Sequence, residues 1–238
     1  MKLDILAVGA HPDDVELGCG ATIAKAVAEG KRVGILDLTR GELGTRGTAE
    51  TRDEEAKHAA KILGVSVREN LGFKDAFFVN DKAHQLEIIK IIRKYQPDIV
   101  LCNAIDDRHI DHGKGSKLVS DACFLSGLLK VETELNGESQ KHWRPTHVYH
   151  YIQWKSIEPD FVVDVTGYIG VKEKAVYAYK TQFFDPESKE PETPISSKNF
   201  TDSINYRARD LGRIIGVEFA EGFTSERYVA VENIFDLK

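Results

Sequence analysis

The chain has 238 residues, of which 42% are hydrophobic, and this length allows one large α/β domain or two small ones. Its net charge of −6 and the lack of a long basic block disfavour binding to nucleic acid or to an anionic membrane. The three cysteines form neither a C-x-x-C pair nor a disulfide framework, no signal-peptide pattern occurs, and no apolar run could span a bilayer. We therefore expect a soluble cytoplasmic protein.

Strand and helix patterns alternate through the first half of the chain. Compact apolar runs predict buried strands at residues 3–9, 33–38, 66–71 and 98–103. Apolar residues at helical spacing predict helices at residues 18–29, 51–63, 82–95 and about 115–129. This alternation predicts a Rossmann-like α/β fold, with a doubly wound, mostly parallel sheet in the order 3-2-1-4 and helices on both faces. The first and fourth strands are then neighbours.

The second half of the chain is less regular. It predicts strands at residues 146–153, 161–165 and 228–231, and helices at residues 168–179 and 203–219. Residues 182–201 form a polar stretch with three of the seven prolines, and a structureless segment of this length often serves as a lid or an interface loop. Since no domain boundary is evident, we expect a single domain over residues 1–238.

Imidazole and carboxylate side chains follow the two strands that we expect to be adjacent. The first strand leads into the segment His11-Pro12-Asp13-Asp14, and the fourth leads into residues 107–112. In a doubly wound sheet, ligands bind at the carboxyl ends of the strands where the strand order reverses, so both clusters point to one crevice. The side chains that could carry chemistry there are His11, Asp13, Asp14, His109, Asp111 and His112.

This set of side chains suits zinc or a similar divalent ion. Two histidines and one aspartate would leave positions open for water and substrate, a free carboxylate would accept a proton, and a cationic group would stabilise an oxyanion. The residues alone do not separate the role of Asp13 from that of Asp14. The turn after the first strand lacks the G-x-G-x-x-G pattern, and its two carboxylates would repel a pyrophosphate, which disfavours a dinucleotide site.

Two motifs resemble those of a known family. His11-Pro12-Asp13-Asp14 with Gly18, followed by His109-x-Asp111-His112, is similar to the LmbE/PIG-L family of zinc-dependent N-acetylglucosamine deacetylases, and the resemblance covers nearly the whole chain. Residues 38–48, 215–218 and 221–223 look like the subgroup of bacillithiol biosynthesis, which converts N-acetylglucosaminyl-malate to glucosaminyl-malate and acetate. The resemblance implies an amidohydrolase with the LmbE/PIG-L fold that removes an N-acetyl group from a linear amide.

The resemblance also implies a role for each residue of the two motifs. The metal would be held by His11, Asp14 and His112. Asp13 would be the general base and later the acid that protonates the leaving amine, and His109 would be the charged group beside the oxyanion. Asp111 would orient a histidine without contacting the ion. Zn²⁺ is the expected cofactor, and Fe²⁺ or another divalent ion also suits this ligand set.

Three arginines could bind the substrate. Arg52 lies on the inward face at the start of its predicted helix, where its guanidinium needs an anion or hydrogen-bond acceptors. The alternative for Arg52 is a pair with a local carboxylate such as Glu42. Arg108 stands beside His109, and Arg46 lies in the glycine-containing loop after the second strand. A fork-shaped guanidinium suits the carboxylates of malate.

The alternatives concern both the substrate and the class of protein. The chain could deacetylate another N-acetylglucosamine derivative, such as a chitooligosaccharide, or hydrolyse a thiol-sugar conjugate. A metal- or nucleotide-binding module without turnover would belong to a different class, but it would not need an uncoordinated Asp13. By analogy with the family we expect a homo-oligomer, specifically a hexamer. His147 and His150 are expected to pack within a strand.

Overall fold

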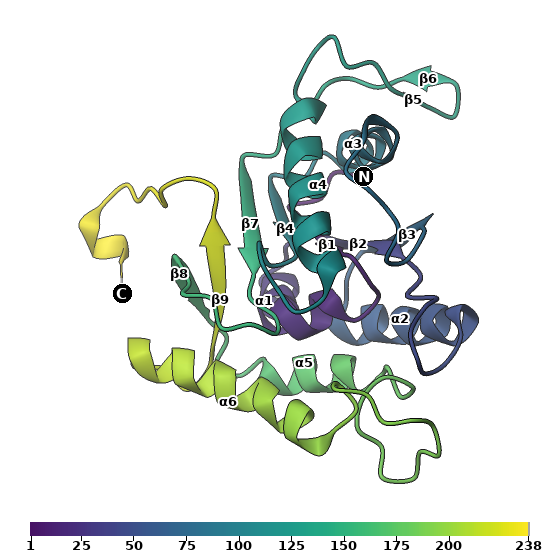
Figure 1. Ribbon diagram of the computed structural model, residues 1–238. Coiled ribbons are helices and arrows are strands. Elements are labelled where there is room, and N and C mark those ends of the chain that lie inside the picture. The colour runs from purple at the N-terminus through teal and green to yellow at the C-terminus, as the bar shows by residue number, and fades with distance from the viewer. Residues whose placement is uncertain (238) are drawn as a thin grey trace.

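The structure of the protein is a computed structural model, which describes residues 1–237. Its central feature is a seven-stranded sheet in the order β3-β2-β1-β4-β7-β9-β8 (Figure 1). The strands are β1 (Ile5–Gly9), β2 (Val33–Thr39), β3 (Val67–Phe73), β4 (Ile99–Cys102), β7 (His147–Tyr151), β8 (Phe161–Asp164) and β9 (Ala220–Ser225). A separate two-stranded hairpin consists of β5 (Glu134–Leu135) and β6 (Glu138–Ser139).

The sheet is mostly parallel. β1 pairs in parallel with both β2 and β4, and β3 and β7 extend this parallel part on either side. β9 runs antiparallel to β7 and to β8. Every residue of β1 and β2 is buried, which is typical of parallel strands that are covered on both faces. The predicted order 3-2-1-4 and the doubly wound α/β class are therefore confirmed.

Two layers of helices cover the sheet. The helices are α1 (Asp14–Ala28), α2 (Ala49–Leu63), α3 (Lys82–Tyr95), α4 (Ile110–Ser126), α5 (Ile169–Val176) and α6 (Lys198–Ile215). Alternate residues of β1 point to opposite faces. Ile5 and Ala7 pack in a core with α1, α2 and α5, whereas Leu6 and Val8 pack in a second core with α3 and α4 (Figure 1). Among residues 1–237, no helix is both long enough and apolar enough to cross a lipid bilayer.

The C-terminal part of the chain differs from the prediction. The predicted helix runs to residue 219, but Gly216 adopts a φ of 76° and ends α6, because a glycine accepts this left-handed conformation without a steric penalty. The chain then turns back into β9, a strand that the sequence did not predict. The predicted strand at residues 228–231 is wrong, since these residues lie outside the sheet. Figure 1 shows the chain leading away from the sheet after β9 to the short helix η1 (Ile234–Asp236).

Candidate active site

The two predicted clusters meet at the carboxyl ends of β1 and β4. These strands are adjacent, with Ile5 paired to Ile99 and Ala7 paired to Leu101. The chain leaves β1 through a short turn into α1, and it leaves β4 through a loop that ends where α4 begins at Ile110. Both connections therefore open onto the same crevice, at the place where the strand order reverses.

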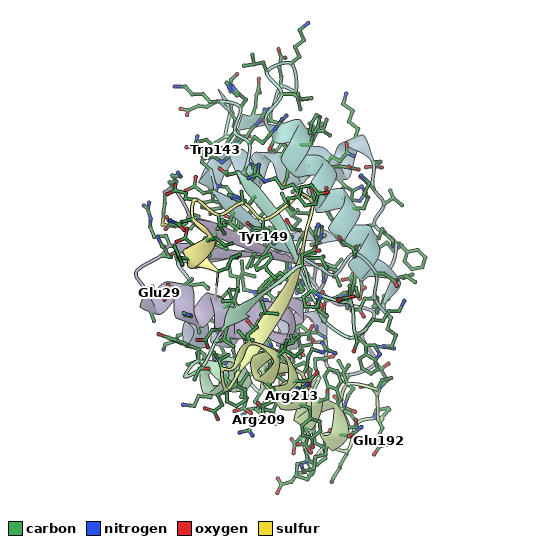
Figure 2. The ribbon with its side chains drawn as sticks, turned by 90° about the vertical axis from the view of Figure 1, so that its left-hand side faces the viewer. Glu29, Trp143, Tyr149, Glu192, Arg209 and Arg213 are labelled. Carbon is green, nitrogen blue, oxygen red and sulfur yellow. The ribbon has the colours of Figure 1, made fainter. Side chains whose placement is uncertain are left out.

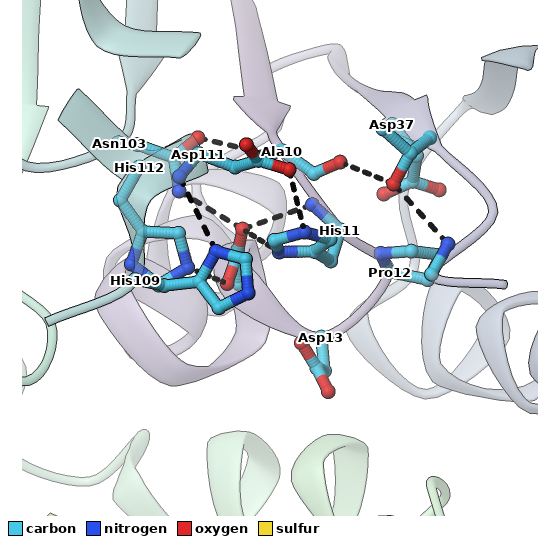
Figure 3. A network of polar contacts seen from close by, with 12 residues as sticks. Ala10, His11, Pro12, Asp13, Asp37, Asn103, His109, Asp111 and His112 are labelled. Carbon is cyan, nitrogen blue, oxygen red and sulfur yellow. Dashed lines mark hydrogen bonds and ion pairs between the residues drawn. The ribbon is translucent and has the colours of Figure 1, made fainter. Parts of the chain in front are cut away.

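The turn after β1 separates two adjacent carboxylates. Asp13 has a φ of 115° and directly precedes the first residue of α1, which is Asp14. A positive φ costs a residue other than glycine on the order of 1–3 kcal/mol, so the surrounding structure must hold this turn in place. Figure 3 shows the carboxylate of Asp13 directed away from the imidazoles of His11, His109 and His112. The two neighbouring aspartates thus face different surroundings.

Three buried side chains converge where an ion could bind. The Nδ1 atom of His11 lies 3.5 Å from Oδ2 of Asp14, and Nε2 of His112 lies 3.1 Å from Oδ1 of the same carboxylate. His109 adds a third imidazole, whose ring centroid lies 4.6 Å from that of His11. Each of the three histidine rings offers one nitrogen within 4.8 Å of the others. We refer to His11, Asp14 and His112 as the ligand cluster.

Carboxylates hold the outward nitrogens of both rings in the ligand cluster. Nδ1 of His112 lies 2.7 Å from Oδ2 of Asp107, and Nε2 of His11 lies 3.1 Å from Oδ1 of Asp75. Burial opposes a charge on both rings, but without an ion Asp14 and Asp107 raise the pKa of His112 to about 9, and Asp111, Asp14 and Asp75 raise the pKa of His11, so both rings are charged. A bound metal would displace the proton that faces Asp14, while the carboxylate on the other side keeps its N–H. Nδ1 of His11 and Nε2 of His112 are therefore the nitrogens presented to Asp14.

Asp111 contacts the far side of His11. Its Oδ2 atom lies 3.4 Å from Nε2 of His11, and the carboxylate also accepts hydrogen bonds from the backbone N–H of Ala76 and from Nζ of Lys114. Burial opposes ionisation, but hydrogen bonds from His11, Lys114 and Ala76 keep the pKa of Asp111 well below its usual range. His11, Asp75 and Asp111 also place one atom each within 4.8 Å of one another. We interpret Asp75 and Asp111 as acceptors for the N–H at Nε2 of His11 and not as ligands of a second ion, because Lys114 already neutralises Asp111.

Asp14 is surrounded by donors. Its Oδ2 atom accepts hydrogen bonds from Nδ2 of Asn103 and from the backbone N–H of His11, both at 2.9 Å, and Nε2 of Gln153 donates to Oδ1. Burial alone would raise the pKa of Asp14, but His112 and His11 hold it well below its usual range. Asp14 is therefore a carboxylate at neutral pH, as a metal ligand must be.

Asp13 is buried with one cationic partner. It is 5% exposed, and its Oδ2 atom accepts a hydrogen bond of 3.1 Å from Nη2 of Arg52. Burial raises the pKa of Asp13 to about 7, against the opposing effect of Arg52. A carboxyl group that ionises near neutral pH suits proton transfer in both directions. Arg52 also donates to the carbonyl oxygen of Pro12, so its carboxylate partner is Asp13 and not Glu42.

His109 is partly buried at the edge of the ligand cluster. The backbone N–H of Asp111 donates to its Nδ1 atom at 3.3 Å, whereas its Nε2 atom has no hydrogen-bond partner among residues 1–237. Burial lowers the pKa of His109, and positive charge on His11 and His112 lowers it further. The ring is therefore mostly neutral at pH 7, whereas the resemblance implies a charged group. His109 would gain a proton only when negative charge develops beside its ring.

The other two predicted arginines occupy different environments. Arg108 is exposed, and its guanidinium stacks over the ring of Trp154 with 4.6 Å between Cζ and the ring centroid. Arg46 is buried, and it donates to the carbonyl oxygen of Phe183 and to the hydroxyl of Ser188. These contacts tie Arg46 to the loop that precedes α6. They support a role in holding this loop more than a contact with substrate.

A cavity of about 450 Å³ adjoins the ligand cluster. Its wall comes from the turn after β1, the loops after β2 and β7, and α6. This volume lies within the range of small-molecule sites, about 300–1,000 Å³. The predicted site residues that line it are His11, Asp13, Asp14, Arg52, Arg108, His109 and His112. Asp111 and Arg46 do not line the cavity, and both are buried.

Four residues of the site are missing from the sequence prediction. Asn103 directly follows β4, and Asp107 is the first residue of the predicted second cluster, so their place beside the second motif is a signal that could have identified them. Asp75 and Gln153 come from the loops after β3 and β7. No local motif marks these two residues, and only the strand order brings their loops to the ligand cluster.

Comparison with known proteins places the chain in a family. The model of the family PIG-L, described as GlcNAc-PI de-N-acetylase, matches residues 6–123. The "Uncharacterized deacetylase YaiS" of Escherichia coli (strain K12) is 39% identical over 115 residues, which are 45% of this chain and 61% of YaiS. The diacetylchitobiose deacetylase of Thermococcus kodakarensis is 31% identical over 190 residues, which are 75% of this chain and 70% of that enzyme.

A solved structure agrees with these matches. The conserved protein TT1542 from Thermus thermophilus superposes with a TM-score of 0.87 at 36% identity, and the match covers 98% of each chain. The segment that matches the family model, residues 6–123, contains both sequence motifs and all three residues of the ligand cluster. The chain is therefore a member of the PIG-L family.

Proposed function

We propose that the protein is a metal-dependent hydrolase that removes the N-acetyl group of N-acetylglucosaminyl-malate and yields glucosaminyl-malate and acetate, in bacillithiol biosynthesis. One observation carries the proposal. Asp14 faces His11 and His112, while its neighbour Asp13 is buried outside the ligand cluster. A hydrolase of this kind needs both an ion site and an uncoordinated proton acceptor. A protein that only binds an ion needs the first of these alone.

The ligand cluster fits a divalent cation. One nitrogen of His11 and one of His112 face the carboxylate of Asp14, and other carboxylates hold the opposite nitrogens. We propose Zn²⁺ as the cofactor, and Fe²⁺ is the alternative because it accepts the same nitrogen and oxygen ligands. When bound, the ion would act as a Lewis acid toward water and the amide carbonyl.

The residues around the ligand cluster would move the proton and stabilise charge. Asp13 accepts the proton of the attacking water and gives it to the amide nitrogen as the C–N bond breaks. Arg52 holds the carboxylate of Asp13 in place through their hydrogen bond of 3.1 Å. His109 lines the cavity and has one ring nitrogen without a partner among residues 1–237, so it can donate a hydrogen bond to the developing oxyanion.

The substrate has a second candidate. The similarity to a diacetylchitobiose deacetylase favours a chitooligosaccharide as the alternative, and the amide of a thiol-sugar conjugate belongs to the same chemical class. Arg108 supports the malate conjugate, because its exposed guanidinium lines the cavity and carboxylates are its best partners. The rates for N-acetylglucosaminyl-malate, diacetylchitobiose and N-acetylglucosamine, measured side by side, separate these candidates.

Acetate release tests the proposed activity. The protein loaded with Zn²⁺ should release acetate from N-acetylglucosaminyl-malate with a higher kcat/KM than from the other two substrates. A chelator should abolish the release, and added Zn²⁺ should restore it. A protein that binds the ion but releases no acetate from any of the three substrates would instead be a metal-binding module without turnover.

We further propose a cytoplasmic, self-associating, single-domain protein, a hexamer by analogy with the family. Apolar side chains near the C-terminal end support self-association, since Tyr228 is 100% exposed and Phe235 is 89% exposed. Large apolar side chains that are exposed to water can be buried by contact with a second copy of the chain. The loop that precedes α6 would serve as a lid over the cavity or as a second contact between subunits. Light scattering on the purified protein measures the mass, and a monomer would contradict self-association.

A further inference from the structure

The charged side chains on the wall of the cavity are paired, with two exceptions. The paired groups are Asp13 with Arg52, Glu221 with Lys172, and Asp14 and Asp75 with histidines. Arg108 and Arg207 also line the cavity, and residues 1–237 offer neither guanidinium a carboxylate oxygen within 4.0 Å. A cavity wall with two unpaired positive charges, in a chain whose net charge is −6, indicates a place for an anion.

Arg207 projects from α6 toward the cavity. It is partly buried, and Nη2 donates a hydrogen bond of 2.8 Å to the carbonyl oxygen of Trp154. Burial lowers the pKa of Arg207, and the negative charge of Asp107 opposes this shift. That carboxylate is already occupied, because it faces His112 and accepts hydrogen bonds from the backbone N–H groups of Trp154 and Lys155. A guanidinium has five N–H donors, so Arg207 keeps donors for a ligand.

Trp154 contacts both arginines. The guanidinium of Arg108, from the loop before α4, stacks on the Trp154 ring at 4.6 Å, and Arg207 bonds to the carbonyl of the same residue. The Trp154 ring also stacks on Phe200 of α6, with 5.3 Å between ring centroids. The backbone N–H of Trp154 donates to Asp107, the carboxylate that holds His112. This arrangement therefore lies next to the ligand cluster.

We propose that Arg207 and Arg108 form a subsite for an oxyanion on the aglycone of the amino sugar, and that Arg207 selects anionic conjugates over neutral ones. The inference rests on the proposed function, because the subsite would bind the distal part of the same substrate. Carboxylate and phosphate groups both suit two guanidinium forks. The arrangement adds α6 to the elements that recognise the substrate, and it gives Arg207 a role that the sequence did not predict.

Three substrates with different aglycones test the subsite. They are N-acetylglucosaminyl-malate, N-acetylglucosamine 1-phosphate and the neutral methyl glycoside of N-acetylglucosamine. In the Zn²⁺-loaded protein, Arg207→Gln should raise KM for an anionic substrate about tenfold, the effect of one charge-assisted hydrogen bond, with little change in kcat. The same variant should leave kcat/KM for the methyl glycoside nearly unchanged. The anionic substrate with the larger loss identifies the anion.

Arg209→Gln is the matched control. Arg209 lies on the same helix, but its side chain is 64% exposed and contacts Glu218 on the outer surface (Figure 2). This variant should change none of the three KM values. Arg207→Lys should recover part of the loss, because it keeps the charge without the fork. The melting temperature and the bound Zn²⁺ of each variant are measured alongside.

Equal losses of Arg207→Gln on anionic and neutral substrates, or no loss on any, would overturn the subsite while the deacetylase activity stands. A wild-type protein that releases acetate from none of the three would overturn the proposed function and the subsite together. The two failures are therefore distinct.

Discussion

Nη2 of Arg52 lies 3.1 Å from Oδ2 of Asp13, and this contact ties α2 to the turn that ends β1. Without Arg52, Asp13 would be a buried carboxyl group with no positive charge bonded to it. Burial raises the pKa of Asp13 to about 7, and Arg52 prevents a larger rise. A partner from another element of the fold thus keeps the proposed proton acceptor ionisable near neutral pH.

Replacement of Asp13 by asparagine removes the proton acceptor and keeps its shape. We expect Asp13→Asn to lower kcat by about 10²- to 10⁴-fold, the usual contribution of a general base, and to leave the bound ion in place. The ion should stay because Asp13 lies outside the ligand cluster. Acetate release and metal content of the same preparation check both parts. Unchanged turnover, or a lost ion, would contradict the role given to Asp13.

Replacement of Arg52 by glutamine should act through Asp13. We expect Arg52→Gln to lower kcat about 10- to 100-fold, the effect of one lost hydrogen bond between charged groups. The loss should be equal for N-acetylglucosaminyl-malate and for the neutral methyl glycoside, because Arg52 is bonded to Asp13. Steady-state kinetics with both substrates measure kcat and KM for each. A loss confined to the KM of the malate conjugate would show instead that Arg52 binds the aglycone.

Asp107 should tune the affinity of the site for its ion. Nδ1 of His112 lies 2.7 Å from Asp107, and loss of such a partner typically weakens metal binding about 10- to 100-fold. We expect this loss of Zn²⁺ affinity for Asp107→Asn in a competition titration with a chelating dye. Asp106→Asn is the control, because Asp106 is exposed and pairs with Lys155. Equal affinities in the two variants would speak against the orientation of His112 by Asp107.

Stability should depend on pH through His150. Nε2 of this ring lies 3.1 Å from Glu226. Burial opposes a charge on His150, but Cys102 and Glu226 raise its pKa to about 10. Because the folded pKa lies above the unfolded value of about 6.5, the pair contributes its full stability below pH 6.5 and loses it as the pH rises through 10.

Glu226→Gln tests this pH dependence. The variant should lower the free energy of unfolding by about 1 kcal/mol or less at pH 6, since Glu226 is partly exposed and solvent screens the pair. The difference from the wild-type protein should vanish above pH 10. Urea denaturation at pH 6, 8 and 10.5 measures it. A difference that stays constant over this range would exclude a contribution from the charged form of His150.

The sequence predicts the part of the fold that carries the ligand cluster. The apolar runs of β1 and β4 and the helices between them are regular, and right-handed crossovers leave one arrangement for them. Because these strands are adjacent, the sequence predicts that His11 and His112, which follow them, lie close together, and in the structure both rings face Asp14. The choice between Asp13 and Asp14 came from the family resemblance, because the positive φ of Asp13 has no signature in the chain.

Long-range contacts set the rest of the site. Asp75 reaches His11 over 64 positions of sequence, and no pattern near Asp75 marks it. Arg207 lies in a helix whose existence is predicted, but its position on the cavity depends on how α6 packs beside β9, a strand that was not predicted. The place of Arg46 in the glycine-containing loop suggests a contact with substrate, whereas in the structure its guanidinium is buried and bonds to the carbonyl oxygen of Phe183.

Metal content after loading with Zn²⁺ shows whether His11, Asp14 and His112 hold an ion. We expect one tightly bound ion per chain in the wild-type protein. His11→Ala and His112→Ala should each lose the ion while both variants keep the wild-type circular dichroism spectrum. Asp13→Asn should retain the ion. An equal zinc content in all four proteins would contradict the claim that His11, Asp14 and His112 form the site.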